Sequence, residues 1–398
     1  NIINSKYVWY SHGHPDHLDE ASFKYFKNSI FLIPDHYGDR ILNYLKKDFN
    51  CIKLKSNEWF QVSKNIKLKS FSDWNQDASL LVDILSKDII FDQNDGKSLG
   101  WSNVIKKDIK NYKNRFLLKL ACWGDADMIN IYDEHDKFIK PYASFQPNVG
   151  EMYSSSMKHW NCNFAIPSSS MHQYVRKDSI KMNEYATPLK RHRDGFDSSS
   201  GELLPAFIRW DSEKNDFKEI NPPENKPLIV DPETIGDSWS DLLEKEDKIL
   251  IENYFKSKKH LQKKLGVIIF NVGGKDFAIE LSKRKEKIRF LAPKNSLVTA
   301  IKNEIFDDML IGNFMKTQLI NIKSLYPDFT PYVTKYSDNG MAKSKQELKK
   351  YFKHYQLNSA NYWQDLFLSN TEGFVRKNFS SNNPIYKAAK ILHRKFIR

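Results

Sequence analysis

The sequence contains little cysteine, and this scarcity argues against two classes of protein. The three cysteines, Cys51, Cys122 and Cys162, are far apart and odd in number. They form no C-x-x-C pair, so we expect neither a disulfide-stapled secreted domain nor a cysteine-based metal or redox motif. A reducing cytoplasm is the compartment that this cysteine usage predicts.

Long apolar runs are also missing from the sequence. No stretch approaches the roughly 18 uninterrupted apolar residues that a membrane-spanning helix needs, and Ile2–Tyr10 is too short for a signal peptide. We therefore expect no transmembrane segment. The sequence begins with Asn1 rather than methionine, which leads us to expect that an upstream piece is missing.

The sequence has fewer acidic than basic residues. There are 49 Asp and Glu against 62 Lys and Arg, and the formal net charge is +13. Solvated helix faces are our first interpretation of this excess, because apolar residues alternate with the lysines. Peripheral contact with an anionic membrane surface stays open as an alternative, and nucleic acid is the least favoured partner. The excess lies mainly in four segments: Lys256–Lys264, Lys283–Arg289, Lys343–Lys353 and Tyr386–Arg398.

The length and the aromatic content indicate a folded chain with more than one domain. The chain has 398 residues, of which 14% are aromatic, and domains of 100–200 residues are usual. A polar segment with little periodicity separates two structured parts. We therefore place an α/β domain at residues 1–190, a linker or wrapping segment at 191–247 and a C-terminal α+β domain of unknown role at 248–398.

Hydrophobic periodicity predicts the elements of both parts. In the first part, short apolar runs alternate with amphipathic helical patterns. The predicted strands there are Tyr7–Tyr10, Ile30–Ile33, Cys51–Leu54, Ile66–Phe71, Ser79–Ile84, Ile89–Phe91, Phe116–Ala121 and Asn163–Ile166. The predicted helices there are Glu20–Asn28, Asp39–Asp48 and Trp101–Tyr112. In the C-terminal part we expect strands at Gly266–Asn271, Lys275–Leu281 and Lys287–Leu291 and helices at Ile249–Leu261, Ser296–Phe306, Gln346–Tyr355, Ala360–Leu368 and Pro384–Ile397.

One short run carries the strongest chemical signal. His12, His14, Asp16 and His17 lie within six residues, directly after the first predicted strand. Imidazole and carboxylate groups are ligands that divalent transition metals accept. His12 and His14 can share one ion because residues two apart in an extended segment point the same way, while Asp16 and His17 can address a second. The alternative is a polar surface turn, but four ligands at this spacing favour a metal site.

This run resembles the signature of the metallo-β-lactamase superfamily, H-x-H-x-D-H after a strand. The resemblance implies an αβ/βα sandwich that holds one or two metal ions at the edge of its sheets, with further ligands from later loops. The superfamily places a sheet layer before this motif. Only eleven residues precede His12, so we expect part of that N-terminal layer to be missing.

The resemblance directs attention to two Asp-rich turns. The superfamily has a His at the turn that is Ser72–Asp77 here, where no His is present. Asp73 is the substitute candidate, with Asp77 or Asn75 as alternatives and a loop-capping carboxylate as the non-ligand interpretation. This departure favours oxygen-rich coordination, with iron rather than zinc.

The resemblance also implies an Asp that follows a buried strand and a His that follows a later one. Asp95 fits the first position best and Asp92 second, although an Asn-Asp-Gly turn explains the same residues. His172 fits the last position, against a buried histidine without a metal.

The order of several short motifs resembles the metallo-β-lactamase-like arm of CMP-N-acetylneuraminate hydroxylases over roughly residues 1–195. Asp77–Asp83, the Asn94-Asp95 turn, Gly124–Asp127 and Pro167–Asp178 carry this likeness. Such hydroxylases also have a Rieske iron–sulfur domain, which needs Cys and His pairs at close spacing. No cysteine of this chain is followed two or three residues later by His, so we expect no Rieske domain here.

These observations favour a metal-dependent hydrolase that acts through a metal-activated water on a polar, anionic substrate. A nucleotide sugar, a glycan precursor or a phosphoester fits that description. Asp16 or Asp95 would position the water. Two divalent ions are expected, zinc first, with Fe²⁺ or Mn²⁺ as alternatives. Two other functions remain open: an iron- and O₂-dependent hydroxylase with a separate electron donor, and a non-catalytic metal-binding protein.

Three cations after the last predicted ligand are candidates for contact with the substrate. Arg176, Lys177 and Arg191 could receive its phosphate or carboxylate groups. The alternative is that they are ordinary surface cations.

Overall fold

The computed structural model describes residues 4–14, 17–121, 129–141, 144, 147–169, 171, 173–223, 226–379 and 383–389. Over these residues the protein is a mixed α/β structure with sheets of three, seven, two and five strands. The α/β class expected from the sequence is confirmed. No helix in the described ranges has both the length and the apolar character needed to cross a membrane.

The three-stranded sheet is built from the first strands of the chain. Its strands β1 (Tyr7–Trp9), β2 (Ile30–Pro34) and β3 (Asn50–Leu54) are parallel, in the order β1-β2-β3. The 3₁₀ helix η2 (Glu20–Tyr25) and helix α1 (Arg40–Leu45) connect them. Both are shorter than the predicted helices Glu20–Asn28 and Asp39–Asp48.

The three-stranded sheet lies between helix α1 and the larger sheet, because side chains of β2 alternate between its two faces. Phe31 and Ile33 pack with Leu45 of α1 on one face, whereas Leu32 packs with Leu68 of the larger sheet on the other. Successive side chains of a strand point to opposite faces, so one strand contributes to two cores. The two sheets therefore lie face to face.

The seven-stranded sheet has the order β11-β10-β8-β7-β6-β5-β4. Strands β4 to β7 form an antiparallel meander, and β7, β8, β10 and β11 are parallel. The carboxyl ends of β7, β8 and β10 consequently meet at one edge of the sheet. The strands are β4 (Trp59–Ser63), β5 (Ile66–Ser72), β6 (Ala78–Ile84), β7 (Asp88–Asn94), β8 (Asn114–Leu120), β10 (Phe164–Ser169) and β11 (Glu202–Leu203).

Two helices cover the other face of this large sheet. Ile105 of α2 (Ser102–Ile109) and Met152 of α3 (Val149–Trp160) share a core with Phe91 of β7. The first part thus has four layers in the order helix, three-stranded sheet, seven-stranded sheet, helices. The periodicity did not predict α3, whose glycine and three serines are poor helix formers. Burial of eight of its twelve residues stabilises it instead.

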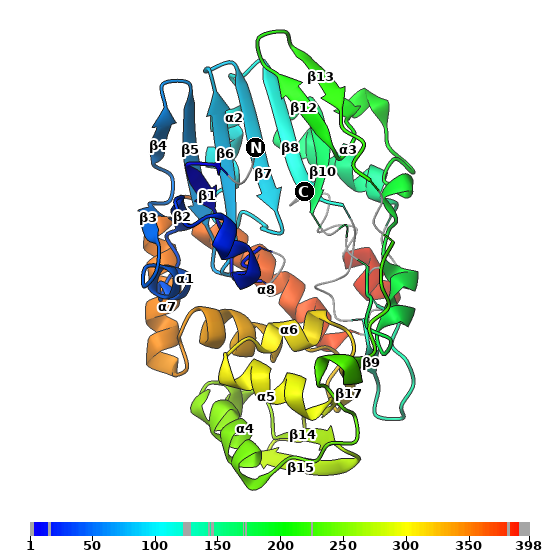
Figure 1. Ribbon diagram of the computed structural model, residues 1–398. Coiled ribbons are helices and arrows are strands. Elements are labelled where there is room, and N and C mark those ends of the chain that lie inside the picture. Colours follow the sequence, from blue (N-terminus) through cyan, green and yellow to red (C-terminus); the bar gives the residue numbers. More distant parts are fainter. Residues whose placement is uncertain are drawn as a thin grey trace.

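The segment 191–247 packs on the first part of the chain. It contributes the edge strand β11 and a hairpin of β12 (Ile208–Asp211) and β13 (Asp216–Glu219). Trp210 of the hairpin lies edge-on against Phe116 of β8, with ring centroids 4.8 Å apart. This contact holds the hairpin against β8, beside β10 (Figure 1).

The C-terminal part is built on the five-stranded sheet, in the order β15-β14-β16-β17-β9. The three strands predicted here are confirmed. The strands are β14 (Val267–Val272), β15 (Lys275–Glu280), β16 (Lys287–Leu291), β17 (Lys316–Ile320) and β9 (Ile131–Tyr132). Because β9 comes from the first part of the chain, this sheet joins segments almost 200 residues apart in the sequence.

Helices α5 (Lys294–Lys302) and α6 (Phe306–Ile311) lie between strands β14 and β15 and the sheets of the first part (Figure 1). The helix predicted at Ser296–Phe306 is confirmed up to Lys302 but wrong beyond it, since the helix ends at Asn303 and Glu304 adopts a φ of 52°. The predicted helix Ala360–Leu368 is longer than expected. The helices are α4 (Lys245–Ser257), α5 (Lys294–Lys302), α6 (Phe306–Ile311), the π-helix η9 (Pro331–Asn339), α7 (Lys345–Asn358) and α8 (Tyr362–Asn378). Residues 384–389 are helical, and the end of the predicted helix Pro384–Ile397 lies outside the described residues.

Candidate metal centre

His12 and His14 lie in the segment that follows β1 at the end of the three-stranded sheet. After β1 the backbone N–H of Tyr10 still bonds to Leu32, and the chain then turns away from the sheet. The Nε2 atom of His12 lies 2.8 Å from Nδ1 of His14. The two imidazoles, which the sequence predicted to point the same way, therefore lie in direct contact.

Asp95 approaches the same point from the end of β7. Asn94 adopts a φ of 48° and Gly96 bonds back to Gln93, so the chain makes a tight turn at the strand end. The turn places an Asp95 oxygen 3.7 Å from Nε2 of His12 and 3.6 Å from Nε2 of His17. The hydroxyl of Ser169, at the end of β10, donates to the other oxygen at 3.3 Å.

The resulting arrangement can hold a divalent cation. One ligand atom from each of His12, His14 and Asp95 lies within 4.8 Å of the others. Ligands around a tetrahedral zinc ion are about 3.3 Å apart, given bond lengths near 2.0 Å. The measured separations bracket that value, so two nitrogens and one oxygen fit the donor set of such an ion.

Burial and neighbouring charges shift the pKa values of His12 and His14 in opposite directions. The pKa of His12 is well below its usual value, first because the ring is buried and then because His14, His17 and Lys335 add positive charge nearby. A neutral imidazole keeps the lone pair that a metal needs. Burial also opposes protonation of His14, but the hydrogen bond and the charge of Asp307 outweigh it and raise the pKa of that ring.

Asp307 is a partner that the sequence analysis did not identify. It lies in the first turn of α6, and its Oδ2 atom accepts a hydrogen bond from Nε2 of His14 at 2.8 Å. This bond leaves Nδ1 of His14 facing His12. A carboxylate behind a histidine ligand orients the ring and increases its basicity. No local pattern marks Asp307, since an acidic residue in the first turn of a helix is common.

Lys335 of η9 brings a positive charge to the same region. Its Nζ atom lies 3.9 Å from carboxylate oxygens of both Asp77 and Asp307, and its side chain is 19% exposed. Burial alone would lower its pKa, but the charges of Asp77, Asp307, Asp73 and Asp95 raise it. The ammonium group therefore offsets part of the negative charge gathered around the cluster.

Asp73, the substitute ligand predicted for the second turn, lies in a capping position. Its carboxylate accepts hydrogen bonds from the backbone N–H of Asn75 at 2.8 Å and of Leu99 at 3.3 Å. Burial and the charge of Asp77 raise its pKa to about 7. It is outside the three-residue cluster, and its position matches the loop-capping interpretation. The pKa of Asp92, the second choice for Asp95, is also raised to about 7, mainly by burial.

Two predicted ligands, Asp16 and His172, lie outside the described residues. His17 and Ser169, which are described, both come close to Asp95. The His-rich turn and the end of β10 are therefore adjacent in the fold, although they are about 150 residues apart in the sequence.

The three predicted substrate-binding cations are paired within the chain. Arg176 binds Asp178 at 2.8 Å and Asp237 at 3.0 Å, and its guanidinium group stacks on Phe314. Lys177 pairs with Asp231 and Arg191 with Asp194 on the surface. These contacts match the alternative interpretation, in which all three stabilise local structure.

A buried hydrogen-bond network supports the His-rich turn from behind. His36 lies 3.3 Å from the carbonyl oxygen of Ser11 through Nε2 and 3.4 Å from the Tyr355 hydroxyl through Nδ1. The Gln76 amide donates to the same hydroxyl at 2.9 Å. Helix α7 thereby links the C-terminal part to the loops around the cluster.

Comparisons with known proteins do not assign this chain to a family. No family model matches its sequence, and no curated protein matches it either.

Proposed function

We propose that the protein is a metal-dependent hydrolase with a metallo-β-lactamase-like site. The convergence of His12, His14 and Asp95 on one point, with Asp307 bound behind His14, is the observation that carries the proposal. The helix–sheet–sheet–helix layering and the position of the cluster at the sheet edge support the same conclusion.

Each described residue would have a distinct task in this site. His12 Nε2, His14 Nδ1 and an Asp95 oxygen would hold the ion, and Asp307 would keep the His14 ring in place. A bound divalent ion would lower the pKa of a water molecule and polarise the bond to be cleaved. Lys335 would balance the charge of the carboxylates around the site. The described residues offer ligands for one ion; a second ion would depend on Asp16, His17 and His172.

The proposed substrates are polar anionic esters, such as a nucleotide sugar, a glycan precursor or a phosphoester. An activated phosphodiester, bis-p-nitrophenyl phosphate, is a suitable first probe of this class. An iron-dependent hydroxylase with a separate electron donor is the alternative that would use the same ligands.

Metal content and hydrolysis can be measured together on the purified protein. We expect zinc or manganese at one or two equivalents per chain, and loss of both metal and hydrolysis in His14→Ala. His135→Ala is the matched control, because that imidazole is 83% exposed. Equal metal in the wild type and His14→Ala would refute the proposal. Bound iron with O₂ uptake would indicate the hydroxylase, and bound metal without turnover would indicate a non-catalytic role.

A further inference from the structure

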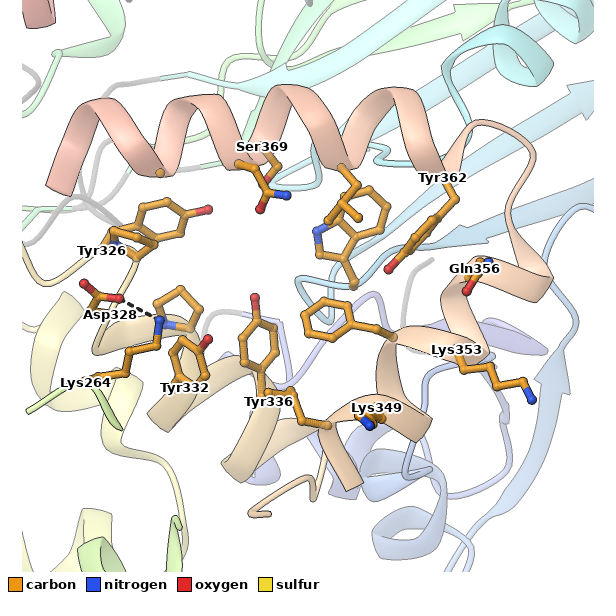
Figure 2. Close-up of a pocket in the computed structure, with 18 of the residues that line it drawn as sticks. Lys264, Tyr326, Asp328, Tyr332, Tyr336, Lys349, Lys353, Gln356, Tyr362 and Ser369 are labelled. Atoms are coloured by element: carbon orange, nitrogen blue, oxygen red, sulfur yellow. Dashed lines mark hydrogen bonds and ion pairs between the residues drawn. The ribbon is translucent and has the colours of Figure 1, made fainter. Parts of the chain in front are cut away.

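A large cavity lies between η9, α7 and α8 (Figure 2). Its volume of about 840 Å³ falls within the range of ligand pockets, roughly 300–1,000 Å³. Figure 2 shows Tyr326, Tyr332, Tyr336 and Tyr362 around this hollow. Aromatic side chains contribute a large share of its wall: Trp74, Tyr326, Tyr332, Tyr336, Phe352, Tyr362, Trp363 and Phe374.

A stripe of exposed aromatic side chains runs along α8 beside this cavity. Trp363, Phe367 and Phe374 are 67%, 70% and 64% exposed. Their spacing of four and seven residues places them on one face of the helix. Leu357, at the end of α7, is 72% exposed and also lines the cavity. Clustered large apolar groups in water are typical of an interaction surface.

Lysines of α7 flank the same cavity. Lys345, Lys349 and Lys353 recur every four residues, and all three line the cavity. None of the three makes an ion pair with another described residue. Positive charge at a helical repeat, next to exposed aromatics, favours an anionic partner.

Carboxylates hardly offset this positive charge. Asp328 is the sole acidic residue among the described residues that line the cavity, against five lysines. It is already paired with Lys264 and Lys377, each at 2.9 Å; Figure 2 marks the first of these pairs. The lysines of α7 are therefore available to an external anion.

We propose that this face, formed by α7 and α8, docks on a membrane surface that contains anionic phospholipid. Trp and Phe side chains on one side of a helix insert at the boundary between headgroups and acyl chains. Lysine side chains nearby can extend toward lipid phosphates while their methylene groups cover apolar surface. The cavity would receive an apolar segment of one lipid. This inference does not depend on the proposed hydrolase activity.

Vesicle flotation with the full chain tests the proposal. Phosphatidylcholine vesicles with and without phosphatidylglycerol are the probes, at low and high salt. We expect binding to the anionic vesicles, weakened by salt, and little binding to the neutral ones. A charge near such a surface contributes roughly fivefold, so Lys349→Gln with Lys353→Gln should weaken binding about 25-fold.

Matched variants distinguish vesicle binding by this face from nonspecific hydrophobic or electrostatic binding elsewhere on the protein. The triple variant Trp363→Ala, Phe367→Ala and Phe374→Ala should lose vesicle binding. Leu228→Ala with Ile229→Ala removes apolar side chains that are 80% and 58% exposed elsewhere, and should bind like the wild type. Lys283→Gln with Lys285→Gln removes two exposed charges outside the cavity, and should also bind normally.

Two further measurements keep the test decisive. Tryptophan emission should shift to shorter wavelength on anionic vesicles in the wild type, and this shift should shrink in Trp363→Phe, a variant that retains an aromatic ring. His14→Ala should bind vesicles normally, so loss of the metal site and loss of docking can be told apart. Absence of vesicle binding, or equal binding to neutral and anionic vesicles, would overturn the proposal. Binding to polyglutamate without binding to vesicles would assign the face to an acidic protein and would also overturn it.

Discussion

The hydrogen bond from Nε2 of His14 to Oδ2 of Asp307, at 2.8 Å, joins residues 293 positions apart. It connects the His-rich turn after β1 to the first turn of α6, and so connects the two parts of the chain. Because the bond orients the His14 ring, the C-terminal part contributes directly to the candidate metal centre.

Asp307→Asn should reduce metal affinity about 10- to 100-fold, because loss of a carboxylate behind a histidine ligand typically has that effect. The amide keeps the size of the side chain but lacks the negative charge that raises the pKa of His14. Titration of the metal-free protein against a chromophoric chelator measures the affinity. Asp48→Asn, at an exposed position, is the control. Unchanged affinity in Asp307→Asn would show that Asp307 has no part in holding a metal.

Lys335→Met should destabilise the metal-free protein by roughly 3 kcal/mol, since it leaves buried carboxylates without their cation. A bound divalent ion supplies positive charge to the same carboxylates. The loss should therefore be smaller with metal than with a chelator. Urea unfolding under both conditions measures the difference, and Lys349→Met is the control, since this lysine forms no ion pair with the part of the chain that the structure describes. An equal loss in both conditions would contradict the electrostatic coupling.

The stability of the protein should fall on acidification, in part because of His260. Burial lowers the pKa of this imidazole to about 4, whereas an unfolded histidine titrates near 6.5. Between these values the unfolded state binds the additional proton, so stability contributed above pH 6.5 is lost as the pH falls toward 4. The loss should reach up to about 3 kcal/mol. Unfolding of His260→Gln across this range should show a smaller slope, and an identical slope would contradict the assignment.

Tyr355→Phe should cost about 1–3 kcal/mol, because it removes the acceptor of the Tyr37 backbone N–H and the shortest acceptor contact of the buried Gln76 amide. The Tyr355 hydroxyl accepts from the Gln76 amide at 2.9 Å and from the Tyr37 backbone N–H at 3.2 Å. Thermal and urea unfolding measure the loss. Tyr25→Phe, at a tyrosine that is 50% exposed, should leave stability nearly unchanged. Similar stabilities for the two variants would argue that the network contributes little.

The sequence by itself determined the mixed α/β class, most strands and the three residues of the candidate metal cluster, His12, His14 and Asp95. Strands of β-branched and aromatic residues have a strong local pattern, as in Ile30–Pro34. His12 and His14 could be paired from the sequence because two residues in an extended segment point the same way. Asp95 could be named as a candidate because it follows a buried strand.

Only the tertiary structure decided what surrounds these residues. Asp307 and Lys335 reach the site from α6 and η9, and nothing in their local sequence records that approach. Helix α3 forms despite poor intrinsic propensity because its apolar face is buried against the large sheet. The pairing of β9 with β17 likewise depends on contacts between distant segments. Periodicity reports the preferences of neighbouring residues, whereas ligand partners, charge balance and sheet order arise from long-range packing.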